Sequence, residues 1–159
     1  MGDIVTLVDS TPGDEDFLFK VYAGVRREEV AAWGWDRAQQ DGFLRMQFMA
    51  QQGGYRARFP DAVYSIIRCG GIPVGSMIVA REKGEIMLVD IALLPEHRRK
   101  GTGRRLLEGL LAESARTGLP LRLSVRRDNP SIRLYSQIGF SVVAEDDVYL
   151  MMENGTRYK

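Results

Sequence analysis

The feature that most constrains the fold is a glycine-containing turn that joins a predicted strand to a predicted helix. Alternating apolar residues predict a strand over Glu85–Leu94, and leucines at helical spacing predict a helix over Gly101–Thr117. A second strand is predicted at Leu119–Val125, after Gly118, which suits the C-terminal cap of the helix. Strand, helix and strand in this order favour a crossover between two parallel strands. The chain is therefore expected to be an α/β (α+β) protein with helices flanking its sheet.

The remaining pattern predicts antiparallel strands and three more helices. The strands are expected at Ile4–Val8, Val63–Arg68, Ile72–Arg81, Phe140–Glu145 and Val148–Glu153, with turns suited to positive φ at Gly70-Gly71 and Lys83-Gly84. The helices are expected after Pro12-Gly13-Asp14, from Asp36 to about Gln51 with Gly53-Gly54 ending it, and over Pro130–Ile138. The predicted order is β-α-α-β-β-β-α-β-α-β-β, a mixed central sheet of about seven strands.

Composition narrows the functional class. The 159 residues, without repeats or a long linker, indicate one domain spanning 1–159. The net charge of +1 gives no electrostatic case for nucleic acid or a membrane as a partner. No apolar run approaches the roughly 18 residues of a membrane span. With one cysteine, one histidine and no signal-peptide pattern, we expect a cytoplasmic protein without a metal site.

The predicted turn carries the clearest chemical signal. Gly101 and Gly103 let the backbone pass close to a ligand, and the helix that begins there directs free N–H groups at the turn. Such a helix start binds phosphate, and basic residues surround it. A Walker A motif is excluded because Arg104 follows its second glycine, and a dinucleotide fingerprint is excluded because Leu106 replaces its third. Without further context, a basic loop with no ligand is an equal interpretation.

Two motifs in order resemble those of the GNAT (GCN5-related) N-acetyltransferase family. The first is Arg98-x-x-Gly101-x-Gly103 after a strand, and the second is Asn129-Pro130-x-x-x-Leu134-Tyr135-x-x-x-Gly139-Phe140. The resemblance is strongest over Gly84–Phe140, and the element order also fits the family fold. It implies a transferase that moves an acetyl group from acetyl-CoA to a primary amine of a small molecule, peptide or protein. The alternatives are the same fold with another acyl-CoA, or a non-catalytic acyl-CoA-binding or interaction module.

The resemblance also implies roles for particular residues. The strand before the turn would bind the pantetheine arm through its backbone, with the Leu93 N–H polarising the thioester carbonyl. Asn129 would bind the same arm, and Tyr135 would bind the cofactor and protonate the departing thiolate. The backbone positions implied for the cofactor are Ile91, Ala92, Leu93, Arg98, Arg99, Lys100, Gly101, Thr102, Gly103 and Arg104. Many members have a small residue near position 99, where this chain has Arg99, and a step of seven residues from the Asn to the Tyr, where the step from Asn129 to Tyr135 is six.

The base that deprotonates the amine is less defined. Glu85 resembles a glutamate base found in some members, and Asp90 on the same predicted strand is the second candidate. Either could instead pair with a neighbouring arginine. The acceptor groove is expected from the first two helices and the last hairpin, which contain Trp33-Gly34-Trp35, interpreted as a hydrophobic plug. The sequence leaves open a homodimer through the exposed final strand.

Overall fold

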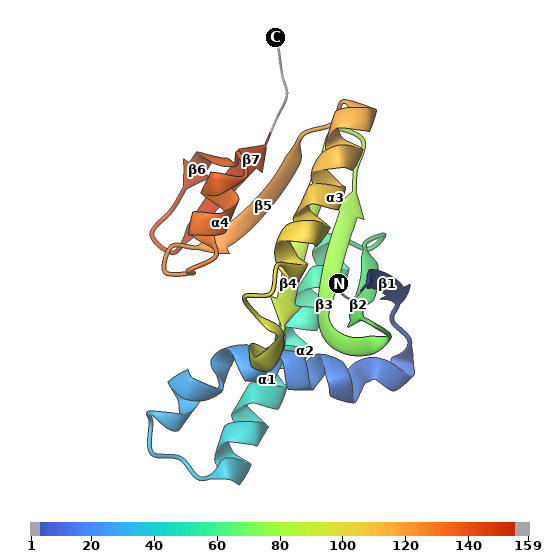
Figure 1. Cartoon of the computed structure of the whole chain (residues 1–159). Coiled ribbons are helices and arrows are strands. Elements are labelled where there is room, and N and C mark those ends of the chain that lie inside the picture. The colour runs from blue at the N-terminus through green and yellow to red at the C-terminus, as the bar shows by residue number, and fades with distance from the viewer. Residues whose placement is uncertain (1–3, 155–159) are drawn as a thin grey trace.

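The protein is a seven-stranded mixed sheet with helices on both faces, as shown by a computed structural model that describes residues 4–154 (Figure 1). The strands are β1 (Val5–Asp9), β2 (Val63–Cys69), β3 (Ile72–Arg81), β4 (Ile86–Leu93), β5 (Leu121–Arg126), β6 (Ser141–Glu145) and β7 (Tyr149–Asn154). Their order across the sheet is β1-β2-β3-β4-β5-β7-β6. The predicted element order and the parallel crossover are confirmed, because α3 connects the parallel pair β4 and β5 and all other neighbours are antiparallel.

The parallel pair is short, and this opens the sheet at its centre. Strands β4 and β5 pair only from Ile86–Leu88 to Leu121–Leu123. Beyond Leu88, β4 continues beside β3 while β5 continues beside β7. The two halves of the sheet therefore diverge along the second half of β4, and Figure 1 shows β5 leaving α3 and β4 at an angle.

Each face of the sheet has its own hydrophobic core. The helices α3 (Thr102–Thr117) and α4 (Ile132–Gln137) cover one face and share a cluster that includes the buried residues Leu107, Leu123 and Tyr135. The helices α1 (Glu15–Ala31) and α2 (Arg37–Arg58) belong to the other face, where Leu44 and Phe48 anchor the helix pair. In the described range 4–154, no helix is long and apolar enough to cross a membrane.

The prediction that Gly53-Gly54 ends the second helix is wrong. Helix α2 continues through both glycines to Arg58 and ends at Phe59, which precedes Pro60 and has left the helical conformation (φ −128°, ψ 70°). A glycine costs a helix about 1 kcal/mol, which packing of the neighbouring Gln52 and Tyr55 offsets. The extra turn brings Tyr55 over the sheet.

One of the two predicted turns and the predicted aromatic plug differ from the structure. Gly70 and Gly71 adopt positive φ (59° and 83°), as predicted, whereas neither Lys83 nor Gly84 does. The turn there is instead closed by the Glu82 N–H, which donates to the Glu85 carbonyl at 2.9 Å. Trp33 and Trp35 do not form a buried plug, because they remain 52% and 37% exposed in an edge-to-face cluster with a phenylalanine at the α1–α2 turn.

A β-bulge in the middle of β4 changes which face its side chains occupy. Ile78 pairs with Asp90 but Val79 pairs with Leu88, so Val89 is an extra residue. Before the bulge Leu88 packs in the α3 core, and after it Ile91 does so. Val89 and Asp90 consequently both face the α1–α2 side, although they are adjacent. Without the bulge, strict alternation would direct Asp90 into the α3 core.

Candidate functional site

The diverging part of β4 directs backbone groups to a side where no strand pairs with them. The Leu94 N–H donates to the Val74 carbonyl at 2.8 Å, so this peptide faces β3. Because neighbouring peptides of a strand face opposite sides, the Ile91 and Leu93 N–H groups face the side that β5 has left. Gly75 makes the close approach of β3 possible, since a Cβ there would lie 2.2 Å from the Ala92 carbonyl oxygen. An extended chain could therefore pair with this edge as an added strand.

The turn after β4 has the geometry of an anion site. Arg99 and Gly101 both adopt left-handed conformations (φ 63° and 82°), and α3 begins at Thr102. The first hydrogen bond of the helix is donated by the Arg105 N–H to the Gly101 carbonyl at 3.0 Å, so the N–H groups of residues 102–104 are not used by the helix. Left-handed residues followed by a helix N-terminus form a concave group of N–H donors that suits phosphate.

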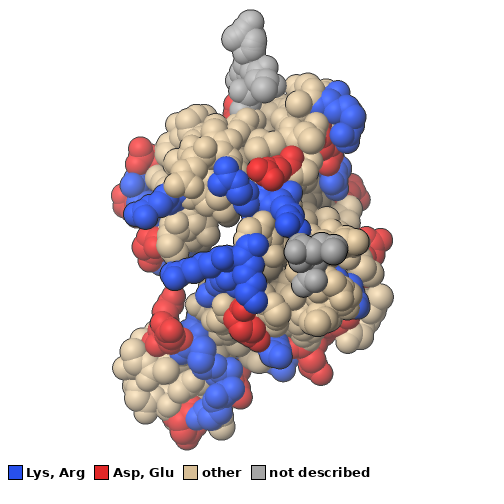
Figure 2. All heavy atoms as spheres, in the orientation of Figure 1, with Lys and Arg blue, Asp and Glu red and all other residues tan. Residues whose placement is uncertain are grey.

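Basic side chains surround this turn, but not all of them face a ligand. Lys and Arg gather in the middle of the face seen in Figure 2, beside a gap between the two halves of the molecule. The Arg98 side chain donates back to the Leu93 carbonyl at 3.0 Å, and the Arg98 N–H donates to the Pro95 carbonyl at 3.3 Å. The Arg98 side chain therefore stabilises the turn. Its backbone N–H is already bonded, so it is not a free donor for a cofactor as the family resemblance implied. Arg126 and Arg127 form ion pairs with Asp128 and Glu145.

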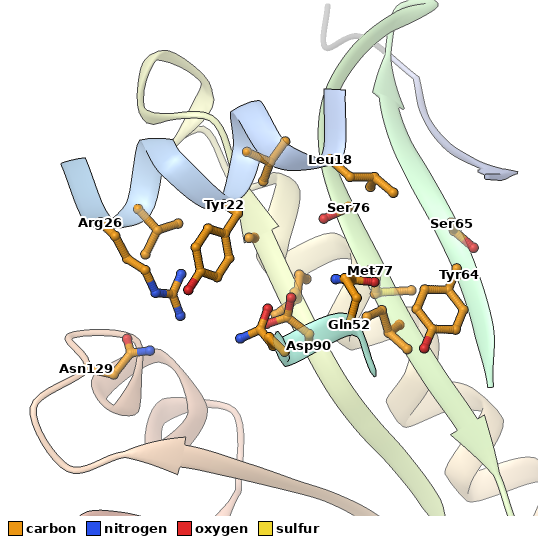
Figure 3. Close-up of a pocket in the computed structure, with 16 residues that line it drawn as sticks. Leu18, Tyr22, Arg26, Gln52, Tyr64, Ser65, Ser76, Met77, Asp90 and Asn129 are labelled. Atoms are coloured by element: carbon orange, nitrogen blue, oxygen red, sulfur yellow. The ribbon is translucent and has the colours of Figure 1, made fainter. Parts of the chain in front are cut away.

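A cavity of about 120 Å³ lies on the other side of the diverging strand, between α1, α2 and the sheet (Figure 3). Asp90 is at its centre, with Tyr22 and Arg26 of α1 on one side and Asn129 facing Arg26 from the loop before α4. The Arg26 guanidinium lies 4.0 Å from the centre of the Tyr22 ring. The cavity thus brings a carboxylate, a cation and a phenol beside the open edge of β4.

The electrostatics of Asp90 suit proton transfer near neutral pH. Burial raises the pKa of its carboxyl to about 6, against the charge of Arg26 and a hydrogen bond from the Ile91 N–H, which both lower it. A carboxyl group with this pKa is mostly ionised at pH 7 and can still accept a proton. Because the Ile91 N–H faces the side that β5 has left, its bond to Asp90 locates the carboxylate at the open edge.

The structure brings Tyr135 and Asn129 to the same region. Tyr135 of α4 is 7% exposed, and burial together with the charge of Asp90 raises its pKa to about 12. Its phenol therefore keeps its proton throughout the neutral range. The Asn129 side-chain oxygen accepts a hydrogen bond from the Ser131 N–H at 2.8 Å, which fixes the amide at the start of α4. Its amino group has no partner within residues 4–154.

The structure does not bring Glu85 to this cavity. Glu85 accepts a hydrogen bond from Arg122 at 3.2 Å, at the end of β4 where the sheet is still continuous. It lies five residues from Asp90 along the strand, or roughly 16 Å at 3.3 Å per residue. The position of Glu85 before the first residue of β4 is therefore that of a structural ion pair, and Asp90 is the acidic group at the open edge.

Sequence reasoning missed two tyrosines that face Asp90. The sequence pattern presents Tyr22 only as part of an apolar helix face, and Tyr55 lies beyond the predicted end of the second helix. Burial raises the pKa of both phenols, and the charges of Asp90 and Arg26 act on both, so the four groups lie together. The polar hydroxyl among apolar neighbours is a signal for Tyr22, but only the continued helix places Tyr55.

Comparison with known proteins gives a family for the chain. The family model described as an acetyltransferase (GNAT) domain matches residues 60–142. Mycothiol acetyltransferase of Clavibacter michiganensis subsp. michiganensis is 40% identical over 63 residues, which are 40% of this chain and 20% of that protein. The chain thus matches only about a fifth of the length of this curated relative.

Solved structures share the fold over nearly the whole chain. PaiA N-acetyltransferase from Thermoplasma acidophilum, in complex with coenzyme A, has a TM-score of 0.69 at 18% identity and covers 96% of this chain and 99% of its own. An acetyltransferase from Thermus thermophilus has a TM-score of 0.66 at 21% identity, with coverages of 96% and 98%. At these identities the likeness concerns the fold.

Proposed function

Because the chain belongs to the GNAT family of acetyltransferases, we propose that it transfers an acetyl group from acetyl-CoA to a primary amine. The single observation that carries this proposal is the position of Asp90, which the β4 bulge turns into a cavity beside the unpaired edge of the same strand. An anion site, an unpaired strand edge and a carboxylate with a pKa of about 6 then follow one another within residues 90–104. A protein that only bound acyl-CoA would not need this carboxylate.

The donor half fits acetyl-CoA through backbone groups. The N–H groups of residues 102–104 would receive the pyrophosphate, and the strand edge at Ile91 and Leu93 would receive the pantetheine arm. The Leu93 N–H would then lie where negative charge develops on the thioester oxygen. The remaining basic side chains at Arg99, Lys100 and Arg104 add attraction for the phosphates.

The acceptor half supplies the base. The amine attacks the thioester carbon, a C–N bond forms and the C–S bond breaks, and the amine loses one proton. We assign that proton to the Asp90 carboxylate. Arg26 assists because a nearby positive charge lowers the pKa of an ammonium group and favours the neutral amine that can attack.

We assign to Tyr135 the role of donating a proton to the departing thiolate. A pKa of about 12 keeps the phenol protonated when the thiolate forms. The thiolate forms in the same low-dielectric region, where its own basicity also rises. The phenol afterwards regains its proton from solvent or from Asp90.

The test is calorimetric titration with acetyl-CoA together with thiol release in the presence of amines, for the natural protein and for Tyr135→Phe. We expect binding at micromolar concentration in both and a turnover at least about 100-fold lower in the variant. No binding at millimolar acetyl-CoA would reject the donor site. Unchanged turnover in Tyr135→Phe would remove this residue from the mechanism.

A further inference from the structure

A second, larger cavity lies beside the inner one. The outer cavity, of about 570 Å³, lies between β1, α1 and the second half of α2. The two cavities share the lining residues Leu18, Gln52 and Tyr64. The two cavities are therefore adjacent and meet at Gln52 and Tyr64.

Two polar groups at this junction have no partner in the protein. Gln52 is only 8% exposed, and within residues 4–154 its amide makes no hydrogen bond. The Tyr64 hydroxyl is buried and also lacks a partner there, and burial raises its pKa. Buried polar groups in native proteins are almost always satisfied. The buried Tyr64 hydroxyl therefore indicates a ligand that brings its own hydrogen-bonding group, and the Gln52 amide beside it is available to the same ligand.

The register of the sheet gives the distance between this junction and the base. Ile78 of β3 pairs with Asp90 of β4 on one side and with Tyr64 of β2 on the other. The three side chains line the same cavity and lie in one row on the same face, with the apolar Ile78 in the middle. Figure 3 shows Asp90 and Tyr64 at this cavity. Two strand spacings separate the Cα atoms of Asp90 and Tyr64 by about 10 Å, the length of three residues of extended chain.

We propose, on the basis of the acetyltransferase function above, that the acceptor is an elongated primary amine with neutral amide or hydroxyl groups. Its amine lies at Asp90, and these groups bind Gln52 and Tyr64. The apolar part between them crosses Ile78, and the tail leaves through the outer cavity. Gln52 and Tyr64 then determine specificity and take no part in proton transfer.

The charges of the outer cavity support a neutral tail. Its lining contains Asp9 and Glu15 but also Arg56, so it does not favour one sign of charge strongly. Amides and hydroxyls are the neutral groups that match both the Gln52 amide, which donates and accepts, and the Tyr64 hydroxyl.

The experiment compares one apolar and two polar primary amines: hexylamine, triglycine amide and glucosamine. We expect kcat/KM to be at least tenfold higher for one or both polar acceptors than for hexylamine. Tyr64→Phe and Gln52→Leu should each lower kcat/KM for the preferred polar acceptor by about threefold to tenfold, the loss of one neutral hydrogen bond. Both should lower kcat/KM for hexylamine less than for the polar acceptor and should leave acetyl-CoA affinity unchanged. Met49→Leu, which also lines the outer cavity, is the control.

The outcomes distinguish a failure of the proposed function from a failure of the acceptor proposal alone. If acetyl-CoA binds but none of the amines is acetylated, the proposed function fails and this inference fails with it. If hexylamine is preferred, or if both variants leave the polar acceptors unaffected, only the inference is overturned. A preference for triglycine amide over glucosamine would identify the source of the polar groups as peptide, and the reverse would identify it as sugar.

Discussion

The donor half and the acceptor half of the site are built in different ways. The proposed donor half, residues 91–104, is one continuous segment in which backbone N–H groups would make the contacts to the cofactor. The acceptor half joins side chains from α1, α2, β2, β4 and the loop before α4. A site made of backbone needs only a conformation, so many side chains can occupy it. A site made of side chains needs each residue, so small changes in sequence alter what it binds.

The largest effect is expected in the acceptor half, at Asp90. Asp90→Asn should lower kcat/KM by about 100-fold to 1,000-fold, because an amide cannot accept the proton of the amine. In the natural protein, kcat/KM should rise with pH up to about 6 and then level, and the variant should lose this rise. A pH profile with the same inflection in both proteins would assign the base elsewhere.

The same substitution should change stability in the opposite direction. The folded protein holds the Asp90 pKa above the unfolded value of 3.8, so folding favours the protonated form. That contribution is complete below pH 4 and is lost as the pH rises through about 6. At pH 7 Asp90→Asn should therefore be more stable, by up to about 3 kcal/mol in urea unfolding, and the difference should vanish near pH 4.

A smaller effect is expected in the donor half, where a backbone group and a side chain can be compared at adjacent positions. Gly103→Pro removes an N–H that α3 does not use, and should raise the Kd for acetyl-CoA by about tenfold to 100-fold. Arg104→Ala removes a half-exposed guanidinium that already pairs with Glu108, and should raise it less than about fivefold. Calorimetry measures both, with thermal unfolding as the control for folding. A larger effect from Arg104→Ala would contradict a backbone-built donor site.

The smallest effect is expected at Arg99, where a side chain occupies a left-handed position. Arg99→Gly should relieve backbone strain and stabilise the protein by up to about 1 kcal/mol, with little change in acetyl-CoA affinity. Lys100→Gly is the matched control, because Lys100 does not have a positive φ and glycine should destabilise there by roughly 0.5–1 kcal/mol. Equal effects of the two substitutions would show that the strain at Arg99 is negligible.

The difference between the halves also explains what could be predicted from the sequence. The apolar periods and the glycines predicted the order of all strands and helices and the turn at Gly101–Gly103, because these are local signals. The bulge at Val89 could not be predicted, because it depends on how β3 and β4 pair. The continuation of α2 through Gly53-Gly54 was missed because packing outweighed intrinsic preference. The prediction of Glu85 as the base rests on a family resemblance and stays a prediction; in the structure Glu85 pairs with Arg122 and Asp90 lines the cavity.

The bulge in β4 affects which residues of this strand can be substituted without disturbing the core. Residues that alternate into the α3 core before and after it, such as Leu88 and Ile91, keep the core intact whatever stands at position 90. The chain can therefore gain, lose or exchange an ionisable group there without repacking its interior. Because Val89 is an extra residue in β4, the side chain at position 90 can change while the residues of the α3 core stay the same.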